Sequence, residues 1–102
     1  MTKILIVDDD VQMLDMVELV LSREGHYVRR AFTALQALEA VKKEATDLVI
    51  IDVTLPDLDG FTLCKALRNT PETAELPILF LTAQQASGSL VGNAGLIAKV
   101  YF

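Results

Sequence analysis

Short apolar runs alternate with segments of helical spacing along most of this chain. Apolar runs of strand length lie at residues 3–7, 48–51 and 77–81, and residues 26–31 also read as a strand. Apolar residues recur every three or four positions at residues 11–21, 35–41 and 61–69. Apolar runs suit strands that are buried on both faces, and intervening helices return the chain for parallel pairing. The pattern therefore predicts the α/β class with a parallel sheet.

The last twenty residues depart from this alternation. Residues 83–95 read AQQASGSLVGNAG, with three glycines, two serines and no strong helical spacing. Residues 95–102 read GLIAKVYF and are compatible with a fifth strand. We therefore expect the regular pattern to end near residue 83.

Length and charge narrow the classes of protein. A chain of 102 residues, 52% of them hydrophobic, fits a single globular domain with its own core. The net charge of -5 and the lack of a basic stripe argue against nucleic acid or an anionic membrane as partner. No apolar run is long enough to span a membrane, no signal peptide is recognisable, and the single Cys64 excludes an internal disulfide. These features predict a cytoplasmic location.

Polar residues follow the predicted strands at their carboxyl ends. Asp8 and Asp9 follow the first run, Asp52 the third and Thr82 the fourth, and Lys99 lies in the possible fifth. The carboxyl ends of parallel strands meet at one edge of the sheet, where ligands of such folds bind. Three carboxylates gathered there repel one another unless a cation lies among them. Oxygen ligands of this kind suit Mg²⁺, which also binds phosphate.

Three motifs in this order resemble the receiver domains of two-component response regulators. They are LIVDDD at 5–10, IIDVTLPDLDGF at 50–61 and FLTA at 80–83. The resemblance is good over residues 1–83 and poor over 84–102, which we treat as the atypical end of one domain at 1–102. It implies a flavodoxin-like doubly wound parallel sheet of strand order 2-1-3-4-5, with a degenerate fourth helix and no fifth helix.

The resemblance also implies a function and roles for individual residues. The domain would be a phosphoacceptor, not an enzyme, that takes a phosphoryl group from a sensor histidine kinase or a small phosphodonor. At most it would assist its own phosphorylation and dephosphorylation. Asp52 would be the phosphoacceptor. Mg²⁺ would be bound by Asp8, Asp9, Asp52 and the backbone carbonyl of Thr54. Thr82 would form a hydrogen bond to the phosphoryl group, and Lys99 would form an ion pair with it.

The C-terminal end departs from the family pattern. Lys99 is followed by Val100 where the family has proline, and it lies 17 residues after Thr82. Without a fifth helix, one face of the sheet is expected to lose its cover, at strand residues such as Ile4, Ile6, Val49 and Ile51. We therefore expect a homodimer or a segment-swapped oligomer. The alternative function is a truncated or engineered receiver fragment that self-associates without phosphotransfer.

Other interpretations of the same residues are weaker. Asp10 is expected to cap the first helix, and Asp59 with Gly60 to form the turn before the third. The stretch LDGFTL at 58–63 is similar to the haloacid dehalogenase motif, but Asp57 follows a proline in a loop where that motif needs a buried strand. A small Mg²⁺ phosphatase lacks an evident general base. Cys64 is expected in the core, and His26 in a structural or exposed position.

Overall fold

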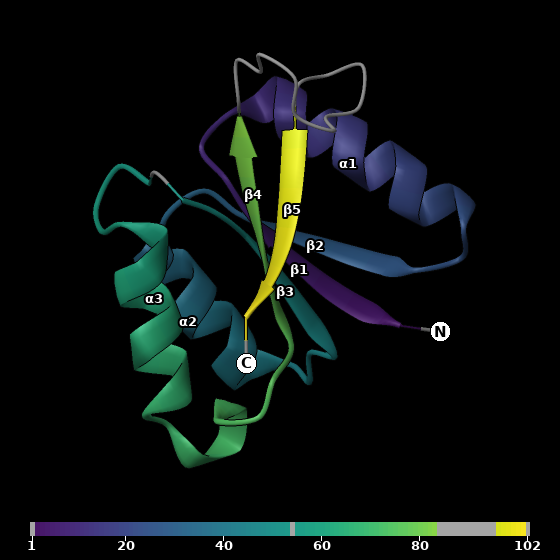
Figure 1. Cartoon of the computed structure of the whole chain (residues 1–102). Coiled ribbons are helices and arrows are strands. Elements are labelled where there is room, and N and C mark those ends of the chain that lie inside the picture. The colour runs from purple at the N-terminus through teal and green to yellow at the C-terminus, as the bar shows by residue number, and fades with distance from the viewer. Residues whose placement is uncertain (1, 54, 84–95, 102) are drawn as a thin grey trace.

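The chain folds into one five-stranded sheet with helices on both faces (Figure 1). The computed structural model describes residues 2–53 and 55–83, with the backbone alone at 82 and 83, and the backbone of strand 96–101. The elements in chain order are β1 (Lys3–Val7), α1 (Val11–Arg23), β2 (Tyr27–Ala31), α2 (Ala34–Lys43), β3 (Leu48–Asp52), α3 (Gly60–Arg68), the 3-10 helix η1 (Pro71–Thr73), β4 (Ile78–Ala83) and β5 (Leu96–Tyr101).

The first four strands confirm the predicted parallel sheet. Their order is β2-β1-β3-β4, and every neighbouring pair among them is parallel. In the register, Val7 lies opposite Ile51 and Asp52 lies opposite Leu81. The carboxyl ends of β1, β3 and β4 therefore lie at one edge of the sheet.

Strand β5 occupies the predicted place next to β4 but runs in the opposite direction. The two strands pair antiparallel, with Phe80 opposite Lys99 and Ala83 opposite Leu96. The expectation that the whole sheet is parallel is therefore wrong at this strand. A parallel neighbour needs a crossover, usually a helix, whereas an antiparallel neighbour does not. The sequence 84–95 lacks helical spacing, which agrees with antiparallel pairing. The degenerate fourth helix expected there lies outside the described residues.

Two apolar clusters, one on each face of the sheet, form the core. On one face, α1 covers Ile4, Ile6 and Ile50 through Leu14, with Val17 and Leu21 packed beside it. The other face packs against α2 and α3, and its buried residues are Leu5, Val7, Ala31, Ala34, Ala37, Val49, Ile51, Leu55, Leu63, Leu67, Ile78 and Phe80.

The expectation that Ile4, Ile6, Val49 and Ile51 lose their cover is wrong. All four side chains are at most 2% exposed. Val49 and Ile51 belong to the cluster that includes α2 and α3, whereas Ile4 and Ile6 pack in the cluster that includes Leu14 of α1. Sequence periodicity shows that strand residues alternate between faces, but it does not assign a helix to either face.

Three side chains cap the helices, and the cap at Asp10 was expected from the sequence. Asp10 caps α1 by accepting hydrogen bonds from the amides of Gln12 and Met13. Thr33 caps α2, and Asp59 caps α3. Half-buried Cys64 packs against the core as expected. Among the helices that the structure describes, none has both the length and the apolar character needed to cross a membrane.

Candidate functional site

Asp8, Asp9 and Asp52 come together at the carboxyl edge of the sheet. One carboxylate oxygen from each lies within 4.8 Å of the others. Asp8 and Asp9 directly follow β1, and Asp52 is the last residue of β3. Because β1 and β3 are adjacent and parallel, with Val7 opposite Ile51, the acids that follow these residues are neighbours. The predicted convergence of these three acids is therefore confirmed.

Asp8 is the buried member of this cluster. Its residue is 4% exposed, and its Oδ1 accepts a hydrogen bond from the amide of Asp10 at 3.0 Å. Burial raises the pKa of Asp8 to about 6, and the charge of Asp52, a hydrogen bond with its carboxyl group and the charge of Asp9 add to the rise. The Asp10 amide opposes it. Asp8 therefore holds its proton to a higher pH than an ordinary carboxyl group does, and a nearby cation would favour its ionised form.

The cluster has the donor chemistry of a magnesium site. Its side-chain ligands are carboxylate oxygens, which are hard donors, and they come from three residues close enough to share one ion. A cation among them offsets their repulsion and the cost of ionising buried Asp8. The residues therefore fit a bound Mg²⁺.

Gly60 packs directly against the backbone of Asp52. Its amide donates a hydrogen bond to the carbonyl of Val53 at 2.7 Å. A Cβ atom built on Gly60 would lie 2.5 Å from the backbone oxygen of Asp52 and 3.0 Å from Ile51. Glycine is required here because α3 begins against the end of β3. Turn chemistry, which the sequence suggests for Gly60, does not reveal this contact.

Asp57 reaches from the segment between β3 and α3 to the start of α2. Its Oδ1 accepts a hydrogen bond from the amide of Ala34 at 2.9 Å, and its Oδ2 accepts one from Leu35 at 3.1 Å. These bonds, and that from Ala34 most of all, lower the pKa of Asp57. The sequence analysis placed this aspartate in the loop. No local signal reveals a partner that lies more than twenty residues away along the chain.

The remaining predicted site residues are placed only in part. Thr82 extends β4 one residue beyond Leu81, which lies opposite Asp52, so its backbone is at the same edge. Lys99 lies opposite Phe80, inside β5 and three positions from the Leu96 end. Because β5 is antiparallel, Lys99 lies within the paired part of β5 and not at the carboxyl end of β4. Thr54 lies outside the described residues.

Fold and site together define a small α/β domain with a cluster of three acids at the carboxyl edge of its parallel strands, where a cation could bind. The family model for the response regulator receiver domain matches residues 4–99. The chain belongs to this family, which confirms the resemblance inferred from its motifs.

Individual relatives are also response regulators. The chain is 42% identical over 98 residues to the transcriptional regulatory protein GltR of Pseudomonas aeruginosa, a match that covers 96% of this chain and 40% of GltR. A solved structure described as a response regulator of Chloroflexus aurantiacus is 49% identical, with a TM-score of 0.80 over 83% of this chain and 70% of that one.

Chemotaxis response regulator CheY4 of Vibrio cholerae is 35% identical, with a TM-score of 0.79 over 84% of this chain and 72% of that one. The curated relatives are much longer than this chain, which spans 34% to 44% of the length of the first three.

Proposed function

We propose that this chain is the phosphoacceptor module of a two-component system. Asp52 takes a phosphoryl group from the phosphohistidine of a sensor histidine kinase, or from a small donor such as acetyl phosphate. The observation that carries the proposal is the convergence of Asp8, Asp9 and Asp52 within 4.8 Å, in a chain of the receiver family. Residues 1–102 act as one receiver domain in this proposal, with the cytoplasmic location expected from the sequence.

The reaction is a phosphoryl transfer to a carboxylate. An oxygen of Asp52 forms a bond to phosphorus. The P–N bond of phosphohistidine, or the P–O bond of acetyl phosphate, breaks and leaves its electron pair on the departing group. The product is an acyl phosphate. Positioning and neutralisation of charge supply most of the rate enhancement in such transfers.

Mg²⁺ is the proposed cofactor. Asp8, Asp9, Asp52 and the carbonyl of Thr54 would hold it, with Asp8 orienting a metal-bound water. When bound, the ion supplies positive charge beside the transferring group. The raised pKa of Asp8 reflects the cost of its negative charge in this site, which an added cation would offset.

Two further residues have proposed roles with unequal support. Thr82 donates a hydrogen bond to a phosphoryl oxygen, which its backbone position at the edge of β4 supports. Lys99 pairs with the phosphoryl group, and this role rests on the sequence resemblance alone, since the register of β5 places its backbone opposite Phe80. In this proposal the domain accepts the phosphoryl group and is not an enzyme, and at most it assists its own phosphorylation and dephosphorylation.

The proposed partner is a sensor histidine kinase. GltR is named a transcriptional regulatory protein, but the match covers less than half of it. The net charge of -5 argues against direct binding of nucleic acid by this chain.

The test is chemical phosphorylation. We expect incubation with acetyl phosphate or phosphoramidate to add one phosphate, read by intact mass, and we expect the addition to require Mg²⁺. The Asp52→Asn variant should gain none. Equal uptake by Asp52→Asn and the parent chain would contradict the assignment of Asp52.

Self-association is a second candidate function, as a homodimer or a segment-swapped oligomer without phosphotransfer. The observation that favours it is apolar surface near the cluster under α1. On α1, Met16 is 38% and Val20 is 56% exposed, and Leu79 and Leu81 on β4 are only partly buried. Light scattering at rising protein concentration tests this function. A monomer at every concentration contradicts it, whereas a dimer that ignores phosphodonor and Mg²⁺ supports it.

A further inference from the structure

Asp57 ties the segment after Asp52 to another element of the fold. It lies between β3 and α3, and its two carboxylate oxygens accept hydrogen bonds from Ala34 and Leu35 in the first turn of α2. Oδ1 also accepts the amide of Leu58 at 3.0 Å, which fixes the carboxylate to its own loop. One side chain therefore joins this loop to a helix that lies before it in the sequence.

Asp57 accepts hydrogen bonds from two amides at the start of α2 that the capping residue Thr33 does not bind. The hydroxyl of Thr33 accepts the amide of Gln36 at 3.1 Å. The first amides of a helix lack partners within the helix, so those of Ala34 and Leu35 need acceptors from elsewhere. Ala34 is buried, whereas Leu35 and Asp57 are exposed. Asp57 supplies an acceptor to both amides, and an amide that loses its acceptor costs stability unless water replaces it.

Helix α2 is also held at its other end. The Nη1 atom of Arg29, on β2, donates to the carbonyl of Ala40 at 3.0 Å, and Nη2 donates to the hydroxyl of Thr46 at 2.7 Å. These bonds fix the C-terminal end of α2 to the sheet. Asp57 therefore binds a helix that is anchored independently of the segment from Asp52 to α3.

The segment from 53 to 59 is constrained at its base as well. The bond from the amide of Gly60 to the carbonyl of Val53 closes it directly beside Asp52. Asp57 fixes the middle of this segment to α2, and the Gly60 bond fixes its end beside Asp52. Loss of the Asp57 bonds would free the part of the segment around Asp57, while buried Leu55 and the Gly60 bond would still hold the part nearer Asp52.

We propose that Asp57 is a positioning residue for phosphoryl transfer. By hydrogen bonding to the start of α2, it holds the segment that follows Asp52 and so keeps the Asp52 carboxylate in the geometry that transfer requires. This role rests on the proposed function of Asp52. Asp57 touches neither phosphodonor nor cation in this proposal, and it acts only through the backbone.

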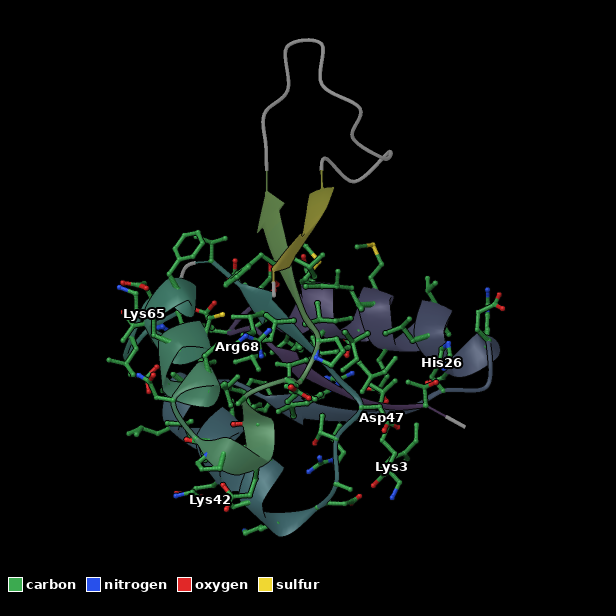
Figure 2. All side chains as sticks on the ribbon, turned by 60° about the horizontal axis from the view of Figure 1, so that its bottom comes forward. Lys3, His26, Lys42, Asp47, Lys65 and Arg68 are labelled. Carbon is green, nitrogen blue, oxygen red and sulfur yellow. The ribbon has the colours of Figure 1, made fainter. Side chains whose placement is uncertain are left out.

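The experiment compares three variants of the full chain, Asp57→Ala, Asp57→Asn and Asp47→Ala. Asp47 is the matched control. It is also an exposed aspartate that accepts a tertiary backbone hydrogen bond, from the amide of Lys3 at 2.8 Å, but it precedes β3 at the opposite edge of the sheet (Figure 2). Both alanine variants remove one negative charge. Asparagine keeps one carbonyl oxygen and can retain one of the two bonds to α2.

Two measurements separate positioning from stability. Hydrogen exchange by NMR reports the Ala34 and Leu35 amides, and intact mass against time gives the phosphorylation rate at saturating acetyl phosphate and Mg²⁺. We expect Asp57→Ala to speed exchange of both amides and to lower the saturated rate by about three- to tenfold, since small misplacement of reacting groups is costly. The exchange and phosphorylation rates of Asp57→Asn should lie between those of Asp57→Ala and the parent chain. Asp47→Ala should keep the phosphorylation rate of the parent within about twofold.

The outcomes distinguish the two proposals. Faster exchange in Asp57→Ala with an unchanged saturated rate overturns the positioning role and leaves Asp52 as the acceptor. An equal loss of rate in Asp47→Ala also overturns it, because loss of charge or stability then explains the effect. If Asp57→Ala does not fold, Asp57→Asn decides by the same two measurements. A folded parent chain that takes up no phosphate overturns the proposed function and this role with it.

Discussion

Asp8 directly follows β1 and Asp52 is the last residue of the adjacent parallel strand β3, and their carboxyl groups interact. The charge of Asp52 and its hydrogen bond to Asp8 add to the effect of burial, which together hold the pKa of Asp8 at about 6. Asp8 is therefore protonated in mildly acidic solution and ionised near neutral pH. This links the stability of the domain to pH and to a bound cation.

The first prediction concerns the stability of the metal-free chain between about pH 4 and pH 6. The folded pKa of Asp8, about 6, lies above its ordinary value of 3.8, so the folded state holds this proton longer than the unfolded state. Protonated Asp8 therefore contributes fully to the free energy of unfolding when the pH is below its ordinary pKa of 3.8. This contribution is lost as the pH rises through the folded pKa of about 6. The loss is at most about 3 kcal/mol, because each pKa unit corresponds to about 1.4 kcal/mol.

Urea unfolding in the presence of a chelator measures this dependence. At pH 7 addition of Mg²⁺ should restore stability, since a ligand that binds only the folded state stabilises it. Asp57 and Asp59 have lowered pKa values, so their ionised forms stabilise the fold. In more acidic solution their protonation lowers the free energy of unfolding, which is the opposite of the effect of Asp8. Stability that is independent of Mg²⁺ at pH 7 would argue against a cation at the cluster.

A second prediction concerns Asp8→Asn. Asparagine keeps an oxygen that can accept the amide of Asp10 and removes the unfavourable buried charge. We expect this variant to unfold at a higher temperature than the parent at pH 7 without metal, by a few degrees for about 1 kcal/mol. Its Mg²⁺ affinity, measured by calorimetry, should be lower by about tenfold or more because one ligating charge is lost. Lower stability combined with unchanged affinity would contradict this account.

A third prediction follows from the contact between Gly60 and Asp52. The Cβ of Gly60→Ala would meet a backbone oxygen at 2.5 Å, so β3 and α3 must move apart. We expect a loss of about 2–4 kcal/mol in the free energy of unfolding and a fall in phosphorylation rate.

Gly25→Ala is the matched control for Gly60→Ala. Gly25 has a φ of 87° but no atom near the added Cβ, so it carries conformational strain without a clash. That strain should cost about 1–2 kcal/mol and leave the phosphorylation rate unchanged. A smaller loss of stability in Gly60→Ala than in Gly25→Ala would refute the close contact.

A fourth prediction tests the anchor of α2 at Arg29. Its guanidinium bonds the carbonyl of Ala40 and the hydroxyl of Thr46 and lies partly buried. Arg29→Met keeps the apolar stem and removes these bonds, so we expect chemical unfolding to show a loss of about 1–3 kcal/mol. Arg23→Met, on the exposed end of α1, should change stability by about 0.5 kcal/mol or less. Equal effects of the two variants would show that α2 is not anchored through Arg29.

Local sequence pattern is sufficient to predict most of the strands and helices and the convergence of the three acids. Four strands, three helices and the cap at Asp10 follow from spacing and residue type, because these signals act within a few residues. Asp8, Asp9 and Asp52 were predicted to converge because each follows an apolar run, and parallel strands share an edge. The strand order came from the resemblance to a family and was confirmed.

Tertiary structure alone decided the direction of β5, the cover of Ile4 and Ile6 by α1, the close contact of Gly60 and the bonds from Asp57 to α2. Each joins segments that are distant in sequence, and each depends on backbone geometry that apolar spacing does not encode. The sequence by itself determined where charge meets the ends of strands. The packing of helices against the sheet determined which of those charges is buried, and so where a cation is favoured.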